Sequence, residues 1–187
     1  MENVGGYLIN SLKRLNFMYQ NEKITTECVK SFEGFTLLGE TFGPFEKGKK
    51  YKIMFFCAIP FIINRILDVT PSEKCDNIDV QRYAISERDD PKLIYTEEQY
   101  FLNKIKEFKQ LLVNDINNKN QPQVNLDRYN SYSSSIIDNR LSKLMKLAKS
   151  EISLDDDRRL TISEKMLFEI LFGLFKNWRK FFLFNKI

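Results

Sequence analysis

The segment 35–48 constrains the fold more than any other part of the chain, because it sets three glycines and a proline among aromatic residues. Glycine tolerates positive φ and proline fixes its own φ, so the segment predicts one tight turn at residues 42–45 and a second at Gly48. β-branched and aromatic residues before the first turn predict strands, and the apolar run 53–63 follows the second turn. Two close turns around buried aromatic side chains indicate a small compact domain.

The whole chain divides into three parts by its residue pattern. Residues 1–21 have the loose apolar spacing of a short helix, residues 22–70 form a small β-rich domain, and residues 71–187 form a helical domain. Within the helical domain, a stretch rich in Asn and Gln has neither periodicity nor apolar content, so we predict a flexible loop near residues 114–132. The predicted fold is mainly α with a small α+β module, in which an N-terminal β-rich domain precedes a helical bundle.

Three long helices are predicted in the helical domain. Residues 96–99 and 161–164 have the form of capping boxes and predict two helix starts, and a further helix is expected to begin near residues 133–135. The polar stretch 70–91 reads as a connection with one short helix. The apolar positions of the three helices are Phe101, Ile105, Phe108 and Leu112, then Ile137, Leu141, Leu144 and Leu147 or Ala148, then Leu167, Ile170, Leu171, Leu174, Trp178, Phe181 and Phe182.

The composition argues against catalysis by this chain. It has no histidine, which removes the usual general base near neutral pH and histidine metal sites. Its three cysteines lack Cys-x-x-Cys spacing, and neither a phosphate-binding glycine loop nor a dinucleotide fingerprint occurs. The acidic residues 155–157 could hold a divalent cation, but carboxylates before a helix start are explained more simply by the helix dipole. We therefore expect no enzyme activity, no cofactor and no metal site.

Length and composition also bound the environment of the protein. The chain has 187 residues, 43% of them hydrophobic, which is enough for a sizeable core. Three widely spaced cysteines fit reduced thiols, no signal peptide is visible, and the longest apolar run falls short of the roughly 20 residues that cross a bilayer. The sequence predicts a soluble, cytoplasmic protein without a membrane segment.

Basic residues in two places open the alternative of direct nucleic-acid binding. Arg140, Lys143, Lys146 and Lys149 recur every three residues and could follow a phosphate backbone, although we interpret the row as the solvated face of an amphipathic helix. A C-terminal basic-aromatic cluster could stack single-stranded bases, although periodicity places its aromatic side chains mainly on the buried side. The cluster consists of Lys176, Arg179, Lys180 and Lys186 with Trp178, Phe181, Phe182 and Phe184.

The last helix carries more apolar surface than a three-helix or four-helix bundle can cover. Aromatic residues lie off its main stripe as well as on it, so part of the helix is expected to be buried against another chain. The residues we predict at this subunit interface are Phe168, Phe172, Phe175 and Trp178.

The turn-rich segment resembles a known family. A strand ending in Leu-Gly, then Gly-Pro-Phe, a glycine three residues on and an apolar segment containing Ala resemble the GINS replication complex, in the subunit class whose small β-rich domain precedes the helical domain. The likeness covers roughly residues 35–69. Pro60 falls where the family's helix continues, so we expect a kink or a restart there. The residues that carry the likeness are Leu38, Gly39, Gly43, Pro44, Phe45 and Gly48, followed by the segment 54–59.

The resemblance implies a non-catalytic subunit of an archaeal, nucleoid-associated complex. It implies a heterotetramer with a sister subunit of reversed domain order, whose helical domains build the core. Such a complex bridges and activates the MCM helicase at the replication fork, together with a RecJ-like or Cdc-type partner. Contact with DNA is then indirect or weak. The matched residues Gly39, Gly43, Pro44 and Gly48 would shape turns, with Phe45 anchoring them in the core.

Overall fold

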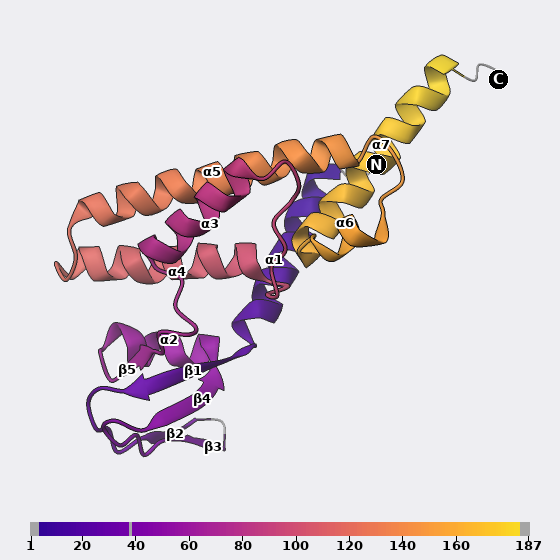
Figure 1. Ribbon diagram of the computed structural model, residues 1–187. Coiled ribbons are helices and arrows are strands. Elements are labelled where there is room, and N and C mark those ends of the chain that lie inside the picture. The colour runs from indigo at the N-terminus through magenta and orange to yellow at the C-terminus, as the bar shows by residue number, and fades with distance from the viewer. Residues whose placement is uncertain (1–3, 38, 184–187) are drawn as a thin grey trace.

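A small β-rich module precedes a helical region in this protein, and α1 runs alongside both (Figure 1). The structure is a computed structural model that describes residues 4–37 and 39–183. The first half of the described chain contains α1 (Val4–Gln20), β1 (Lys23–Cys28), β2 (Phe35–Leu37), β3 (Glu40–Phe42), β4 (Lys50–Met54), α2 (Phe55–Ile63) and β5 (Leu67–Val69). The second half contains α3 (Asn77–Asp89), α4 (Phe101–Asn117), α5 (Gln123–Leu147), α6 (Leu154–Arg158) and α7 (Ile162–Leu183). The predicted fold class is confirmed.

The small module is a three-stranded antiparallel sheet with a separate hairpin. Strand order in the sheet is β4-β1-β5, and Thr26 faces Tyr51 on one side and Val69 on the other. β2 and β3 pair as a two-stranded hairpin in which Phe35 lies opposite Phe42. Strand β5 thus forms one edge of the three-stranded sheet.

Helix α2 covers the sheet and joins the module to the helices. Phe55 is completely buried, with its ring centroid 5.4 Å from that of Tyr19 on α1 and 5.9 Å from that of Phe108 on α4. Pro60 lies inside α2 and the helix does not restart there, contrary to one of the two expected outcomes. One hydrophobic cluster thus contains residues of α1, the sheet, α2, α3, α4 and α5.

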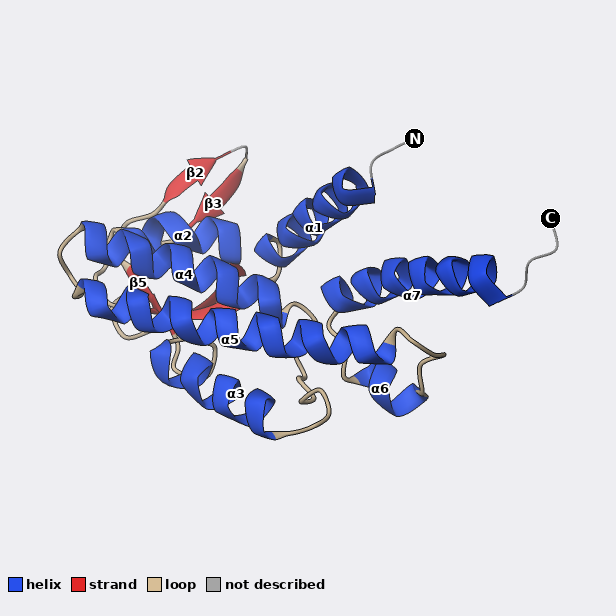
Figure 2. Ribbon diagram, turned by 90° about the horizontal axis from the view of Figure 1, so that it is seen from above, coloured by secondary structure: helices blue, strands red, loops and turns tan. Residues whose placement is uncertain are grey.

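The predicted flexible loop near 114–132 is wrong. Helix α4 continues to Asn117 and α5 already begins at Gln123, so only a short turn separates two antiparallel helices that lie side by side in Figure 2. The residues on both sides of this turn are helical, and Tyr129 in the first half of α5 faces the core. Tyr129 is buried there, and its hydroxyl donates hydrogen bonds to the carbonyls of Cys75 and Ile105 at 3.2 and 3.0 Å.

Helix starts are only partly as predicted. Thr161 and Glu164 form the expected capping box at α7, because the Thr161 amide donates to Glu164 Oε2 at 2.9 Å. The box predicted at residues 96–99 starts no helix; α4 begins later, after Tyr100, which makes no side-chain cap. The short helix expected in the stretch 70–91 is α3, which Asp76 caps through the amides of Ile78 and Asp79.

Candidate subunit interface

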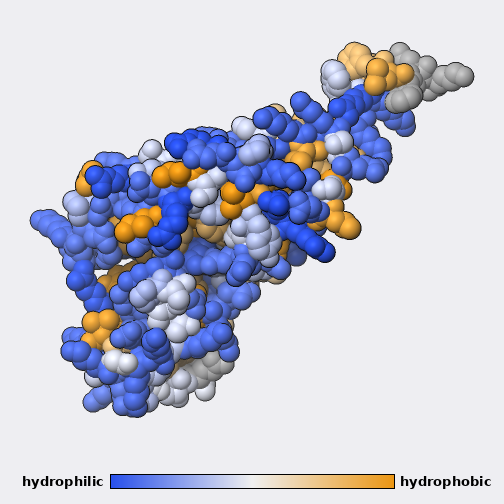
Figure 3. Space-filling model, viewed as in Figure 1, coloured by the Kyte–Doolittle hydropathy of each residue, from blue (hydrophilic) through white to orange (hydrophobic). Residues whose placement is uncertain are grey.

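The second half of α7 extends beyond the body of the molecule (Figure 1). Its first half packs beside α1 and α5, where Phe168 is buried in a second hydrophobic cluster with Leu144, Ala148 and Leu160. Beyond that, the exposed fractions of Trp178, Phe181 and Phe182 are 65, 67 and 61%. Figure 3 shows the resulting orange surface at the tip of the helix. Large apolar side chains that stay exposed together mark an interaction site.

A buried ion network fixes the base of α7. Arg140 of α5 is only 1% exposed, and its guanidinium pairs with both oxygens of Glu164 on α7, at 2.6 and 2.7 Å. The same guanidinium donates to Glu87 Oε2 of α3 at 2.8 Å and to the Tyr83 hydroxyl at 2.7 Å. Backbone carbonyls of Ile94 and Arg159 accept its remaining N–H groups. Because each group is satisfied, the charges hold α3, α5 and α7 in one arrangement.

The ionisation of this network follows from its geometry. Burial opposes the charge of Arg140, but hydrogen bonds and Coulombic attraction to Glu164 outweigh it and raise the arginine's pKa above its ordinary value. For the Tyr83 hydroxyl, in contrast, burial itself raises the pKa, because it opposes the charged phenolate. The network therefore keeps a charged guanidinium and a neutral phenol near neutral pH.

The basic row on α5 is not a solvated face, which corrects our interpretation of it. Arg140 lies in the buried network, and the Lys143 ammonium donates to Glu87 Oε1 at 2.5 Å and to the carbonyls of Glu87 and Lys92. Only Lys146 and Lys149 of that row are exposed. The exposed apolar side chains Ile137, Leu141 and Met145 occupy another side of the same helix. Lys143 is therefore paired with Glu87 and is not a free cation on the surface of α5.

The predicted interface residues do not form one surface. Phe168 is covered by its own chain, and Phe172 stacks on it with ring centroids 5.8 Å apart. Phe172 and Phe175 are half-buried, whereas Trp178 is exposed. The surface available to a partner thus begins at Phe172 and extends to the end of the helix.

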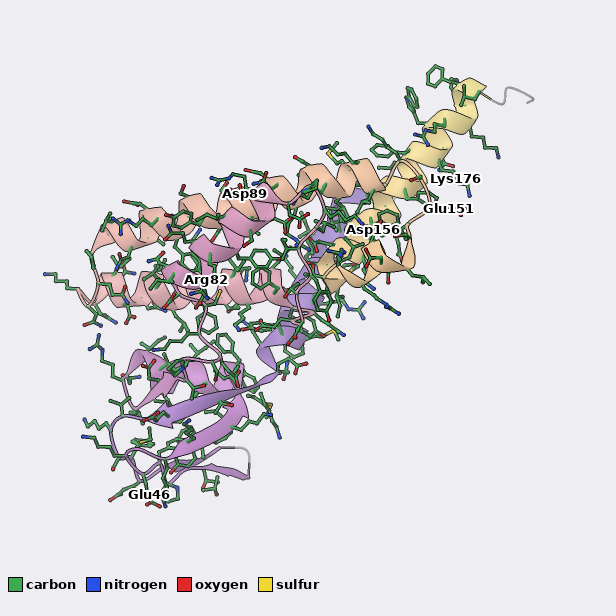
Figure 4. All side chains as sticks on the ribbon, viewed as in Figure 1. Glu46, Arg82, Asp89, Glu151, Asp156 and Lys176 are labelled. Carbon is green, nitrogen blue, oxygen red and sulfur yellow. The ribbon has the colours of Figure 1, made fainter. Side chains whose placement is uncertain are left out.

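The C-terminal basic-aromatic cluster is exposed, contrary to the expectation that its aromatic rings are buried. Trp178, Phe181 and Phe182 contact one another, with centroids 4.8 and 5.0 Å apart for the pairs that include Phe182. Lys176, which Figure 4 marks where α7 leaves the body, Arg179 and Lys180 lie among these rings on the same exposed part. Phe184 and Lys186 lie outside the described residues.

An apolar groove lies between α1, α4, α5 and α7, close to the base of the extended helix. It encloses about 550 Å³. Apolar side chains dominate its walls, with Lys13 and Lys106 among the polar ones. The apolar residues are Leu8, Ile9, Leu12, Leu102, Ile137 and Leu167. Groove and helix end together present the apolar surface that the sequence predicted would exceed the chain's own core.

The turns of the small module are only partly as predicted. Gly48 lies in a turn that the Lys49 amide closes on the Glu46 carbonyl, but residues 42–45 end β3 and form a bridge to Phe32 instead of a tight turn, and the chain reverses at Gly39 instead. Gly39, Gly43 and Gly48 have φ of +83, +97 and +80°, and the bond between Gly43 and Pro44 is cis. Gly43 has a second constraint: a Cβ on it would lie 2.7 Å from the Cα of Gly34, so the two backbones touch. Phe45 is buried, as predicted. Leu38 lies outside the described residues.

No cluster of metal-ligating side chains accompanies this surface in the described part of the chain. No group of three or more Cys, Asp or Glu side chains there could hold a metal ion. The acidic residues 155–157 form the first turn of α6, where the Ser153 hydroxyl accepts from the Asp156 amide. Cys28 and Cys75 are buried thiols that form no disulfide. Within residues 4–37 and 39–183, no helix has the length and apolar composition needed to cross a bilayer.

Neither a protein-family model nor a curated protein matches the chain. A function for this chain is therefore inferred from its own residues and their geometry.

The sequence analysis missed the buried ion network. A signal was available, because Tyr129, Ser133, Ile136, Arg140 and Leu144 follow one another at spacings of three and four residues on a single helix face. An arginine inside such a face requires a buried carboxylate partner. The capping-box Glu164 was recognised, but only for its role at the helix start.

Proposed function

We propose that this chain is a non-catalytic subunit of a GINS-type complex, which bridges and activates the MCM helicase at the replication fork. Support comes from the order of a small β-rich module before a helical region, with the Gly-Pro-Phe segment in that module. The observation that carries the proposal is the exposed aromatic end of α7 on a rigidly anchored base. Such a surface suits a permanent partner chain.

Under this proposal the partner is a sister subunit of reversed domain order, with which the chain forms a heterotetramer. The half-buried Phe172 and Phe175 and the exposed Trp178 make the contact, while Phe168 supports them from below. MCM and a RecJ-like or Cdc-type protein bind the assembled complex, DNA contact is indirect or weak, and the complex works in the cytoplasm of an archaeal cell, at the nucleoid.

Co-expression with candidate sister subunits tests the proposal. Wild-type chain should elute with the sister subunit as one species of heterotetrameric mass by size-exclusion chromatography and light scattering. The Phe172→Asp, Phe175→Asp double variant should be monomeric with nearly unchanged helical circular dichroism, because it places charges in an apolar contact. Trp178→Asp, at a position where 65% of the residue is exposed, should do the same without any effect on folding.

Ile78→Asp is the matched control for these variants. Ile78 is 64% exposed in the first turn of α3, where a carboxylate is tolerated. It should leave the complex intact. An unchanged mass for the α7 variants, or equal dissociation by the control, would count against the proposal.

A second candidate function is favoured by one observation. Trp178, Phe181 and Phe182 are exposed beside basic residues, and residues 170–183 contain no carboxylate. Rings and cations in this arrangement bind single-stranded nucleic acid by stacking and phosphate contact. Anisotropy of a labelled oligothymidylate separates the two candidates, because backbone binding weakens steeply with salt whereas the apolar subunit contact barely responds.

A further inference from the structure

The small module contains an open aromatic groove that is separate from α7 and independent of the proposed assembly. It lies between the β2–β3 hairpin and α2, and encloses about 630 Å³. Sites for small molecules and short peptide segments have volumes of this order. Its apolar walls are formed by the five phenylalanines Phe32, Phe35, Phe42, Phe56 and Phe61, together with Cys57, Pro60 and Ile66.

The phenylalanine rings are held in place from behind. Phe35 stacks on Phe42 with centroids 5.5 Å apart, and the buried Phe61 lies 5.8 Å from both Phe32 and Phe35. The backbone contact of Gly34 with Gly43 fixes the base of the hairpin that carries two of these rings. Phe35 and Phe56 remain 41 and 46% exposed, so the groove is preformed and open to solvent.

Among the described residues, Lys30 is the one charged residue that lines the groove, and two further cations lie next to its lining residues along or beside the chain. Lys47 donates its amide to the hydroxyl of the lining Ser31 at 3.2 Å, and Arg65 lies between the lining residues Asn64 and Ile66. In the part of the chain that the structure describes, none of these three cations makes an ion pair and no carboxylate lines the groove. Glu33, beside Phe32, is the nearest acidic residue in sequence to these walls. Unpaired cations around an apolar floor complement a ligand that is apolar in the middle and acidic at its ends.

We propose that this groove binds a short peptide segment of a partner protein, in which a large apolar side chain is flanked by Asp or Glu. The apolar side chain enters between Phe56 and the hairpin, and the flanking carboxylates meet Lys30 and Arg65. A peptide fits better than a nucleic acid, because Phe35, Phe42 and Phe61 already pack against one another and leave few free ring faces for stacking bases. Backbone recognition would also require a longer row of cations than this rim supplies.

Selection from a random dodecapeptide phage library on the immobilised full-length chain tests this. We expect enriched peptides to share an aromatic or leucine residue next to Asp or Glu. A fluorescein-labelled synthetic peptide of the enriched sequence should bind at least tenfold more weakly to Phe56→Ala and to Lys30→Glu. Phe17→Ala is the matched control, since Phe17 is also a phenylalanine, is 67% exposed and does not line the groove. The Phe17→Ala variant should bind the peptide as the wild type does.

Other outcomes overturn the inference. They are a library without a shared motif, a motif without acidic residues, binding unaffected by Phe56→Ala, or displacement of the peptide by oligothymidylate of twelve nucleotides. Phe56 is 46% exposed and not part of the buried core, so an unchanged thermal transition should confirm that this variant is folded. The test involves no α7 residue and no sister subunit, so its failure is distinguishable from failure of the assembly proposal.

Discussion

Arg140 is the residue on which the arrangement of the helical region depends most. Its guanidinium neutralises Glu87 and Glu164, which are almost fully buried on two other helices. Replacing it with Met leaves both carboxylates with reduced compensation, and removing one partner of a buried ion pair costs about 3–5 kcal/mol. We expect Arg140→Met to lower the free energy of unfolding in urea by that amount.

Lys146→Met supplies the comparison for Arg140→Met. Lys146 lies on the same helix but is exposed and makes no ion pair among the described residues, so its loss should change stability by at most about 0.5 kcal/mol. Equal effects of the two substitutions would show that the buried network adds nothing to stability.

Cys75 makes stability depend on alkaline pH. Burial raises the pKa of its thiol from an ordinary 9.0 to about 11. As pH rises, the unfolded chain therefore loses this proton before the folded protein does. The stabilising contribution of the protonated thiol to the free energy of unfolding is complete below pH 9 and is lost as pH rises through about 11. At about 1.4 kcal/mol per pKa unit, the loss is about 2–3 kcal/mol. Urea unfolding at pH 8, 9.5 and 11 should show it, and Cys75→Ala should flatten the curve. An equally steep curve for Cys75→Ala would assign the dependence to tyrosines.

At the scale of elements, the turn between α4 and α5 shows what residue pattern alone does not reveal. Helix α4 ends in a Schellman motif, in which the amide of Asn120 donates to Asp115 and that of Lys119 donates to Ile116, both at 2.8 Å. Lys119 has φ of +58°, where glycine is the usual residue. The prediction of a long loop failed because Asn and Gln favour turns locally, whereas the buried Tyr129 makes the following segment helical.

Lys119→Gly should stabilise the protein for the same reason. It removes the steric cost of a lysine in the left-handed conformation, which is about 1–2 kcal/mol. Against this, glycine increases the conformational entropy of the unfolded chain, which destabilises the folded state by about 0.5–1 kcal/mol. The net gain is up to about 1 kcal/mol, measurable as a higher midpoint of urea unfolding. Asn118→Gly, at the neighbouring position with φ of −82°, should instead be neutral or destabilising. A lower midpoint for Lys119→Gly would mean that its side chain contributes more than its backbone costs.

The sequence predicted best where local chemistry decides the conformation. The turn at Gly48 and the capping box at Thr161 depend on neighbouring residues and were correct. Burial of Arg140 depends on carboxylates 24 and 53 residues away, which no local pattern contains. Counting apolar residues predicted uncovered apolar surface on the last helix. The expected burial of Trp178, Phe181 and Phe182 was wrong, because it depended on where the other helices end.

At the scale of the molecule, the small module and the helices share one core. Phe55 lies at their junction, between Tyr19 and Phe108. Phe55→Ala should lower the unfolding free energy by about 3–5 kcal/mol, and both modules should still unfold in a single transition. Far-ultraviolet circular dichroism and calorimetry should give coincident midpoints. Two separate transitions in the wild-type chain would show that the modules are independent domains.

Because α7 is one continuous helix, the direction in which the rings at its exposed end point depends on the number of residues before them. The helix rotates by about 100° and rises 1.5 Å per residue, so the azimuth of Trp178 is set ten residues earlier at the buried Phe168. An insertion or deletion between these two positions would rotate the aromatic rings around the helix axis relative to the body of the molecule. The number of residues between Phe168 and Trp178 therefore matters in addition to which side chains occupy the two positions.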